Sequence, residues 1–464
     1  MQNEYKLSSF DLAKNTFLES QLSVRKRPKF INVLDDIELL DNSVIGEEEV
    51  ENWFIIIKDC ILGSNEIDLL DKLEKLSRIT NKKKVLYSDS IITNGIAEYF
   101  ANRLTGQTPI TILVLSIIRN LCISQEKYSE AFHTYSVECK LIDILHKSRV
   151  SNEFYYLTIE TLSSMVYISV SINKEVQNNL RINVLLDRAF GSKNDSKLIK
   201  YILKIMCIFA KNIAITEEEF ENLFDSSLSI LTSVVDETNN LFIEFLFHMS
   251  FHFWFGYILM QNEPILSFLK LQLTSTSTVV LKMVLGIFYN SFHGSITPSD
   301  VPFIFSFCIK NLNTKDSELF EFTKDIIIDI IINNSHFEPF EIEIIKNMIL
   351  ICINKIEKGR YIDKISGFDL LSFIIIEWFD SIPFALNNGL INSLIIILDI
   401  NDENSRVICL ELLRFLLEKD STISYASSIV NMLRETDIIS ILNDITEETD
   451  PKTQVLIQSI YPFL

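Results

Sequence analysis

Strongly apolar segments recur along the chain at a nearly constant interval. Each is about 12 to 16 residues long, which is longer than most β-strands. The clearest eight are Ile110–Cys122, Tyr156–Ser169, Lys197–Asn212, Asn240–Phe255, Thr278–Phe292, Leu319–Asn334, Gly367–Asp380 and Ser405–Lys419. Their centres lie about 38 to 47 residues apart, which is the period of stacked helical repeats. The pattern therefore predicts apolar helices that share an elongated core with their neighbours.

Between these segments lie more amphipathic stretches, which we predict to be the second helix of each repeat. The clearest of them are Ala131–His146, Gln177–Phe190, Phe220–Val234 and Ala385–Leu398. Start signals support the assignment: Thr216 and Glu219 have the spacing of a capping box, and Asp402 stands three residues before Ser405. Asp300 precedes a helix with Pro302 in its first turn.

The composition agrees with an all-helical chain. Isoleucine and phenylalanine are abundant and favour strands, but Asp325 and Asp329 fall four residues apart, on one face of a helix. The 464 residues include only 11 glycines and 9 prolines, whereas usual shares are roughly 7% and 5%. Sheet proteins and nucleotide-binding enzymes need these residues at their turns. We therefore predict the all-α class.

The first 46 residues differ from the rest, so we predict a polar, partly flexible leader over residues 1–46 and a helical array over residues 47–464. Ser23–Phe30 is a small basic cluster. It is either part of a solvated leader or a nuclear-import or docking tag. Met1–Leu22 lacks the apolar core of a signal peptide.

The net charge of −20 restricts the choice of partners. A negative field repels phosphate backbones, so we predict no nucleic acid partner. The acidity either keeps an unusually apolar chain soluble or attracts a basic partner segment. Seven single cysteines without a CxxC pair indicate reduced, buried thiols, and hence the cytosol or the nucleus; they are Cys60, Cys122, Cys139, Cys207, Cys308, Cys352 and Cys409.

One stretch, Leu241–Met260, has the length of a membrane span. Glu244, His248 and His252 lie within it, and a carboxylate in hydrocarbon costs several kcal/mol. No basic residue flanks its C-terminal side before Lys270. We predict a helix buried within the array and no membrane span.

The same three residues are the best candidates for metal ligands. Spaced by four, Glu244, His248 and His252 would project from one helix face. They would span roughly 12 Å along the helix, so an ion would need both histidines and a ligand from another helix. The alternative is that the histidines form hydrogen bonds inside the stack. We predict no metal, no cofactor and no catalytic site, because no P-loop, dinucleotide-binding, nucleophile-elbow or HExxH motif is present.

Two apolar segments resemble the third helix of armadillo repeats. Ser116–Cys122 and Gly286–Phe292 place Asn120 and Asn290 where that family carries the asparagines that clamp extended peptides. Other segments depart from the pattern, with Ser164 or Phe415 near that position. The resemblance implies an all-α, right-handed α-solenoid of about eight to ten armadillo/HEAT-like helical repeats.

Ala385–Asp420 is also similar in layout to the C-terminal region of ataxin-10-like proteins, which implies a cytosolic scaffold linked to cell division or growth. The chain departs from that family at Ser405–Val407, where an Asn-Pro-Phe sequence is usual.

Together these observations predict a non-catalytic scaffold that holds a protein partner. Binding is expected on the concave side through Arg119, Asn120 and Asn290, with an extended or basic segment as the ligand. The alternative is a regulator of a GTPase or an Hsp70-type chaperone that acts as a nucleotide-exchange factor, which armadillo-like proteins of the same fold also do.

Overall fold

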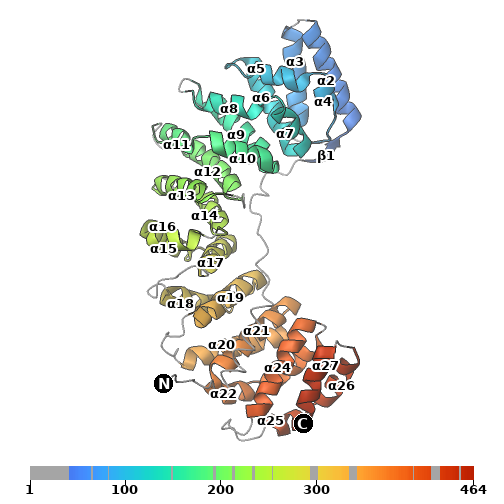
Figure 1. The fold of residues 1–464 in the computed structure, drawn as a ribbon, viewed down its shortest axis with the longest axis vertical. Helices are drawn as coiled ribbons and strands as arrows, with labels where there is room; N and C mark the ends of the chain where they lie inside the picture. The colour runs from blue at the N-terminus through green and yellow to red at the C-terminus, as the bar shows by residue number, and fades with distance from the viewer. Residues whose placement is uncertain are drawn as a thin grey trace, which may run out of the picture. The chain divides into compact units, whose positions relative to one another are not determined.

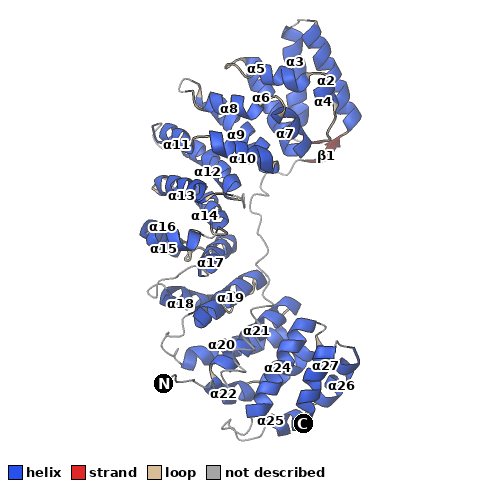
Figure 2. Ribbon diagram, in the orientation of Figure 1, coloured by secondary structure: helices blue, strands red, loops and turns tan. Residues whose placement is uncertain are grey.

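The computed structural model confirms the all-α class (Figure 2). It describes residues 41–63, 66–81, 83–147, 150–191, 195–211, 215–232, 236–252, 254–292, 301–333, 342–400, 402–419, 429–448 and 451–464. The basic segment Ser23–Phe30 and Asp300 lie outside these residues. The chain divides after Leu271 into two compact units, which we call the N-terminal and the C-terminal unit.

The N-terminal unit is helical apart from two short strands. Its elements are β1 (Asp41–Ile45), α2 (Glu47–Leu62), α3 (Glu66–Thr80), β2 (Lys83–Val85), α4 (Ser90–Thr93), α5 (Ile96–Arg103), α6 (Pro109–Ser124), α7 (Glu126–His133), α8 (Val137–Leu145), α9 (Asn152–Ile168), α10 (Val170–Asn179), α11 (Ile182–Gly191), α12 (Ser196–Ala210), α13 (Glu217–Leu231), α14 (Asp236–Met249), α15 (Phe255–Gln261) and α16 (Glu263–Gln272).

In the C-terminal unit every described element is a helix. The elements are α17 (Thr278–Phe292), α18 (Val301–Asn311), α19 (Ser317–Asn333), α20 (Ile342–Lys358), α21 (Tyr361–Glu377), η2 (Phe379–Ser381), α22 (Ile382–Asn387), α23 (Leu390–Asp399), α24 (Glu403–Lys419), α25 (Ile429–Arg434), α26 (Ile438–Glu448), α27 (Pro451–Ile460) and η4 (Tyr461–Phe463).

The helices formed by the eight apolar segments stack in chain order within each unit, although Asn240–Phe255 is divided because α14 ends at Met249. In the N-terminal unit α3, α6, α9, α12 and α14 pack each against the next (Figure 1). In the C-terminal unit α17, α19, α21 and α24 do the same, followed by α27. Central residues such as Leu115, Leu162 and Ile374 are fully buried. We call each series a third-helix row, because most of its members follow shorter helices of their own repeat.

Several predicted second helices are broken in two, so those predictions were wrong in detail. The stretch Ala131–His146 is divided between α7 and α8, and Gln177–Phe190 is divided between α10 and α11. Ala385–Leu398 is divided between α22 and α23. A short first helix, a second helix and a long third helix make up the repeats α7–α8–α9 and α10–α11–α12, which is the armadillo-like arrangement.

Left-handed backbone conformations produce two of these breaks. Gly389 has a φ angle of 107° just before α23, and Ser136 has a φ angle of 52° just before α8. A right-handed helix cannot pass through such a residue. Glycine signals such a conformation in a sequence, but serine does not.

The predicted helix starts that fall on described residues agree with the structure. Thr216 and Glu219 form a complete capping box at α13. Asp402 accepts a hydrogen bond of 2.9 Å from the backbone N–H of Ser405 at the start of α24. These side chains satisfy N–H groups that the first turn of a helix leaves unpaired.

A feature absent from the sequence analysis is a small parallel sheet. The strand β1 pairs with β2, and Ile45 lies opposite Val85. Both side chains are buried, and the hydroxyl of Tyr128 donates a 2.7 Å hydrogen bond to the carbonyl of Leu86 just after β2. The sheet thereby ties the residues before α2 to the connection between α3 and α4.

The membrane-length stretch Leu241–Met260 is not one helix, because α14 ends at Met249 and α15 begins at Phe255. Within the described ranges, no single helix has the length and apolar character needed to cross a membrane. The bent pair Phe379–Asn387 and Leu390–Asp399 meets that test together, by length and composition.

Replacing Gly389 by alanine should destabilise the C-terminal unit. A Cβ at this residue would make only ordinary contacts, at 3.4 Å and beyond, so the cost is that of a left-handed backbone, about 1–2 kcal/mol. Urea unfolding would measure the change, followed by the fluorescence of Trp378 for Gly389→Ala and by that of Trp53 and Trp254 for a control in the N-terminal unit. Ser136→Gly is the reverse replacement at a residue that also has a positive φ angle, and it should leave the free energy of unfolding unchanged or higher. An equal loss of stability in the two variants would contradict a cost that comes from the left-handed backbone.

Candidate protein-binding surface

Arg119 connects two helices of the third-helix row in the N-terminal unit. It lies on α6, and its Nη1 donates a 2.9 Å hydrogen bond to Oε2 of Glu160 on α9. Its Nη2 donates to Oδ1 of Asn81 at 3.1 Å. The side chain of Arg119 is 20% exposed, so its guanidinium is largely engaged within the row and still reaches the surface.

Asn120 holds α6 against α3. Its side chain is buried, and its Nδ2 donates to Oγ1 of Thr80 at 3.1 Å and to the carbonyl of Ser77 at 3.4 Å. Asn290 is half-buried on α17, in the C-terminal unit. The structure thus places Arg119 beside Asn120 and puts Asn290 in the other unit. Their part in partner binding stays a prediction.

A strip of lysines and tyrosines runs along α12 of the third-helix row, where α12 packs against α9. Tyr156 of α9 and Tyr201 of α12 have their ring centroids 6.0 Å apart. Nζ of Lys197 lies 4.6 Å from the ring of Tyr156, and Nζ of Lys204 lies 5.9 Å from that of Tyr201. The whole lysine–tyrosine strip consists of Tyr156, Tyr167, Lys197, Lys200, Tyr201, Lys204 and Lys211.

The strip exists because α12 is amphipathic. Lys197, Lys200, Tyr201 and Lys204 follow the i, i+3, i+4, i+7 spacing of a single helix face. Lys197 and Lys200 are exposed, and Tyr201 and Lys204 are half-buried. Every other residue from Leu198 to Ala210 is buried. The apolar side of α12 therefore faces the core and leaves the lysines on the outer side of the row.

The positive charge of the three lysines on α12 is only partly compensated. None of Lys197, Lys200 and Lys204 forms an ion pair with a carboxylate within the described ranges. Burial and the neighbouring charge of Lys200 lower the pKa of Lys204, although Glu160 and Glu244 act in the opposite direction. Lysines four residues apart on a helix repel each other by roughly 0.2–0.5 kcal/mol. An acidic ligand would remove this repulsion.

The third-helix row of the C-terminal unit has the opposite character. Lys324 is buried on α19, and its Nζ contacts Oδ1 of Asp325 at 3.0 Å and Oδ2 of Asp369 at 3.2 Å. Partial desolvation of its carboxyl group and the charges of Asp325 and Asp369 raise the pKa of Glu321, against the effect of Lys324. We call Glu318, Glu321, Asp325 and Asp369 the carboxylate cluster.

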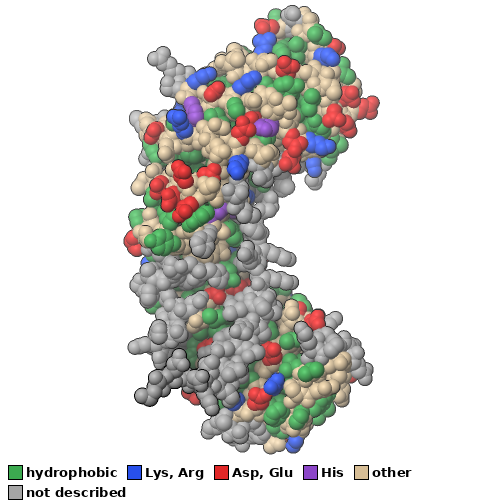
Figure 3. All heavy atoms as spheres, viewed as in Figure 1, with side chains coloured by type: hydrophobic (Ala, Val, Ile, Leu, Met, Phe, Trp, Pro, Cys, Tyr) green, Lys and Arg blue, Asp and Glu red, His purple; other side chains and the backbone are tan. Residues whose placement is uncertain are grey.

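Acidic side chains also lie on the outer helices. In the space-filling view they gather over α13 and over the first turn of α2 (Figure 3). Glu217, Glu218 and Glu219 begin α13, and Glu47, Glu48 and Glu49 begin α2. Negative charge is favourable at a helix N-terminus because of the helix dipole, so these groups have a structural role.

The candidate metal ligands predicted from one helix face do not share one helix. Glu244 and His248 lie on α14, but His252 follows its end at Met249. Nε2 of His252 donates a 2.8 Å hydrogen bond to the carbonyl of Ala210. His248 Nε2 is 3.6 Å from Oε1 of Glu244, and both side chains are buried. Burial lowers the pKa of His248, so the pair is a core contact.

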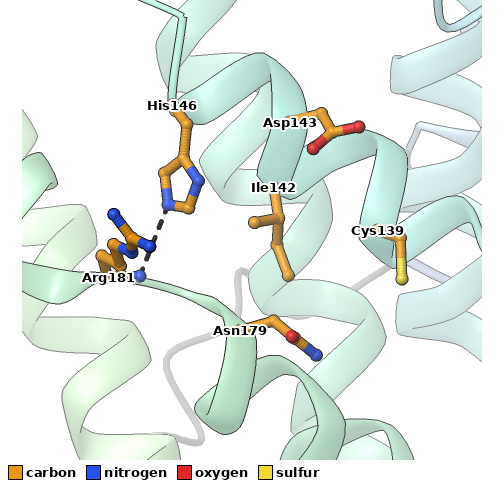
Figure 4. Close-up of a pocket in the computed structure, with 6 residues that line it drawn as sticks. All are labelled: Cys139, Ile142, Asp143, His146, Asn179 and Arg181. Atoms are coloured by element: carbon orange, nitrogen blue, oxygen red, sulfur yellow. Dashed lines mark hydrogen bonds between the residues drawn. The ribbon is translucent and has the colours of Figure 1, made fainter.

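A shallow pocket of about 340 Å³ lies between α8 and the junction of α10 and α11. It is lined by Cys139, Ile142, Asp143, His146, Asn179 and Arg181. Nε2 of His146 points toward Arg181 and accepts a hydrogen bond from its backbone N–H at 3.4 Å (Figure 4). The seven cysteines are free thiols. Five are buried, while Cys60 and Cys139 are half-buried.

The lysine–tyrosine strip is not among the sites predicted from the sequence, although part of its pattern is present there. Lys197, Lys200 and Lys204 share one helix face within Lys197–Asn212, a segment that the apolar pattern predicts only as a core helix. The contact of this face with Tyr156 and Tyr167 depends on the stacking of α9 on α12.

Neither the models of known protein families nor the curated proteins include a match to this sequence. Among solved structures, an engineered protein from the Northeast Structural Genomics Consortium is similar with a TM-score of 0.66 at 14% identity, over 90% of this chain and 99% of that chain. A designed armadillo repeat protein in complex with a (KR)4 peptide has a TM-score of 0.43 at 11% identity, over 52% and 99%.

A computationally designed armadillo repeat protein for modular peptide recognition has a TM-score of 0.42 at 12% identity, over 52% of this chain and 99% of that chain. The narrower resemblance to ataxin-10-like proteins gains no support from these comparisons. At such low identity a likeness shows the fold alone. The fold of this chain is an all-α solenoid of armadillo-like helical repeats.

Proposed function

We propose that the protein is a non-catalytic scaffold whose N-terminal unit holds an extended acidic segment of a protein partner along the lysine–tyrosine strip. The observation that carries the proposal is the stripe of Lys197, Lys200 and Lys204 on α12, which has no carboxylate partner among the described residues of a chain with a net charge of −20. Uncompensated charge of one sign in a protein of the opposite sign favours a ligand that supplies counter-charges.

The length of the strip suits an extended ligand. Lys197 and Lys211 stand 14 residues apart, roughly 21 Å along a helix axis at about 1.5 Å per residue, and an extended chain advances roughly 3.3 Å per residue. About six residues of ligand would therefore span the strip, and a nine-residue peptide would cover it. Aspartate or glutamate side chains would contact Lys197, Lys200 and Lys204, while the rings of Tyr156 and Tyr201 would cover the intervening backbone.

Peptide binding to the full-length chain tests the proposal. Fluorescently labelled nine-residue peptides rich in glutamate, serine or lysine would be compared by anisotropy at low and at physiological salt. We expect the acidic peptide to bind at least about ten-fold more tightly than the serine peptide, and to weaken as salt screens the charges. Equal affinity for both peptides, or no salt dependence, would refute an electrostatic strip.

The carboxylate cluster of the C-terminal unit favours a second candidate, a basic segment bound along α19 and α21. Glu318 and Glu321 are exposed there. Lys324 and Lys282, which contacts Glu318 at 2.6 Å, are two cations against four carboxylates. The lysine peptide of the same assay tests this site. Its affinity should fall in the double variant Glu318→Gln and Glu321→Gln and should be unaffected by changes to α12.

Regulation of a GTPase or an Hsp70-type chaperone is a further use of such a fold. It rests on fold analogy alone. Nucleotide release from candidate GTPases and chaperones, with and without the protein, would decide it.

A further inference from the structure

Four potential metal ligands converge at the break between α7 and α8. His133 is the last residue of α7, Glu138 and Cys139 lie in the first turn of α8, and Glu175 comes from α10 of the next repeat. One ligand atom each from His133, Glu138 and Glu175 lies within 4.8 Å of the others. The Sγ atom of Cys139 lies 3.7 Å from Oε1 of Glu175 and 3.9 Å from Oε1 of Glu138.

The spacing of these atoms matches a tetrahedral ion. Zinc binds nitrogen and oxygen at about 2.0–2.2 Å and sulfur at about 2.3 Å, so its ligand atoms lie roughly 3.3–3.8 Å from one another. Only one nitrogen of the His133 ring can bind the ion. Nδ1 lies 2.9 Å from Oε1 of Glu138, a contact that would lengthen by a few tenths of an ångström around an ion. The distances of 3.7 and 3.9 Å from Sγ of Cys139 to the two carboxylates are close to such edges.

The carboxylate of Glu138 supplies a second, independent indication. Its side chain is 1% exposed, and its Oε2 atom finds no hydrogen-bond partner among the described residues. Its other oxygen, Oε1, contacts Nδ1 of His133 at 2.9 Å. A carboxylate that is buried with one oxygen unpaired is unfavourable, and a bound cation would offset this by neutralising its charge. The side chains of His133 and Glu175 are 38% and 41% exposed, so an ion can enter from solvent.

From this geometry we propose that the N-terminal unit binds one Zn²⁺ ion through His133, Glu138, Cys139 and Glu175. One imidazole nitrogen, one thiolate and two carboxylates suit zinc, whereas calcium and magnesium prefer oxygen ligands alone. The ion joins α7 and α8 of one repeat to α10 of the next. It thereby holds a helix break that starts with an unfavourable left-handed serine, Ser136. This inference does not depend on the proposed peptide binding.

Zinc binding to the full-length protein tests the proposal directly. Protein treated with a chelator and dialysed against Zn²⁺ should retain one ion per chain by mass spectrometric metal analysis, and its unfolding temperature should rise. Competition with a chromophoric chelator gives the affinity. Glu175→Gln and Cys139→Ser, both at half-exposed or exposed positions, should each weaken binding at least about ten-fold, because even outer-shell partners of a metal are worth 10–100-fold.

Cys60→Ser is the matched control. Its thiol is also half-buried and donates to a carboxylate, Oδ2 of Asp68 at 3.3 Å, but it lies outside the cluster, so the affinity should not change. Substitution with Co²⁺ should produce the intense visible absorption of a tetrahedral site and a thiolate charge-transfer band that Cys139→Ser removes. Absence of stoichiometric Zn²⁺, or wild-type affinity in both cluster variants, would overturn the site; a missing thiolate band would overturn the four-ligand set.

Discussion

Reversing two charges of the lysine–tyrosine strip, with Lys200→Glu and Lys204→Glu together, should nearly abolish binding of the acidic peptide. Each replacement removes an attraction and puts a like charge against the ligand, which costs more than neutralisation. We expect affinity to fall by about 100-fold at low salt, or roughly 2.7 kcal/mol. Anisotropy titration with the glutamate-rich peptide measures the change, and the loss should shrink as salt is added.

A control with the same change in net charge separates the strip from the general field of the protein. Lys127 on α7 and Lys174 on α10 are both exposed and lie outside the third-helix row. Lys127→Glu with Lys174→Glu should leave the affinity within about two-fold, because exposed charges that do not touch the ligand are strongly screened at physiological salt. An equal loss in both double variants would show that net charge, and not the strip, drives binding.

Replacing Lys324 by methionine should destabilise the C-terminal unit more than any other single charge removal that we consider. The ammonium is 7% exposed and contacts Asp325 and Asp369. Removing one partner of a buried ionic group costs roughly 3–5 kcal/mol, and we expect about 3 because Asp369 partly reaches solvent. Urea unfolding would report the change through Trp378, in a background with Trp53→Phe and Trp254→Phe so that one unit alone is followed.

The pH dependence of that variant has a definite sign. Without the lysine, Glu321 loses an attraction and keeps the repulsion of Asp325 and Asp369, so its pKa in the folded state should rise further above its unfolded value. The pKa of Glu321 is already raised in the unmodified chain. A carboxyl group with a raised folded-state pKa destabilises the fold at high pH and ceases to do so once it is protonated. The deficit of Lys324→Met should therefore be full at pH 7 and shrink as the pH falls through this raised value.

An exposed ion pair provides the comparison for Lys324. Lys346 contacts Glu343 at 2.7 Å, but the two side chains are 33% and 75% exposed. Lys346→Met should change stability by less than about 1 kcal/mol. A loss as large as that of Lys324→Met, or a Lys324→Met deficit that grows in acid, would contradict the assignment of Lys324 as the ion that holds the carboxylate cluster together.

The succession of long helices could be predicted from the sequence because each apolar segment must be buried, and its own residues show this. A segment such as Ile110–Cys122 is apolar on nearly all sides, so it needs neighbours whatever their identity, and the interval between such segments reports the size of one repeat. The helix starts at Thr216 and Asp402 could also be predicted, because a capping side chain accepts a hydrogen bond from a backbone N–H only three residues further along the chain.

Side-chain contacts between repeats could not be predicted from local sequence patterns. Stacking brings together positions about 40 residues apart, which is why Lys197 meets Tyr156 and why Glu175 reaches His133. No local pattern marks these pairs. The left-handed Ser136 is likewise held by its surroundings and not by its own preference. The recurring apolar segments of the sequence thus determine the stacked-helix architecture. The candidate binding sites on its surface depend on side chains from neighbouring repeats, which only the tertiary structure brings together.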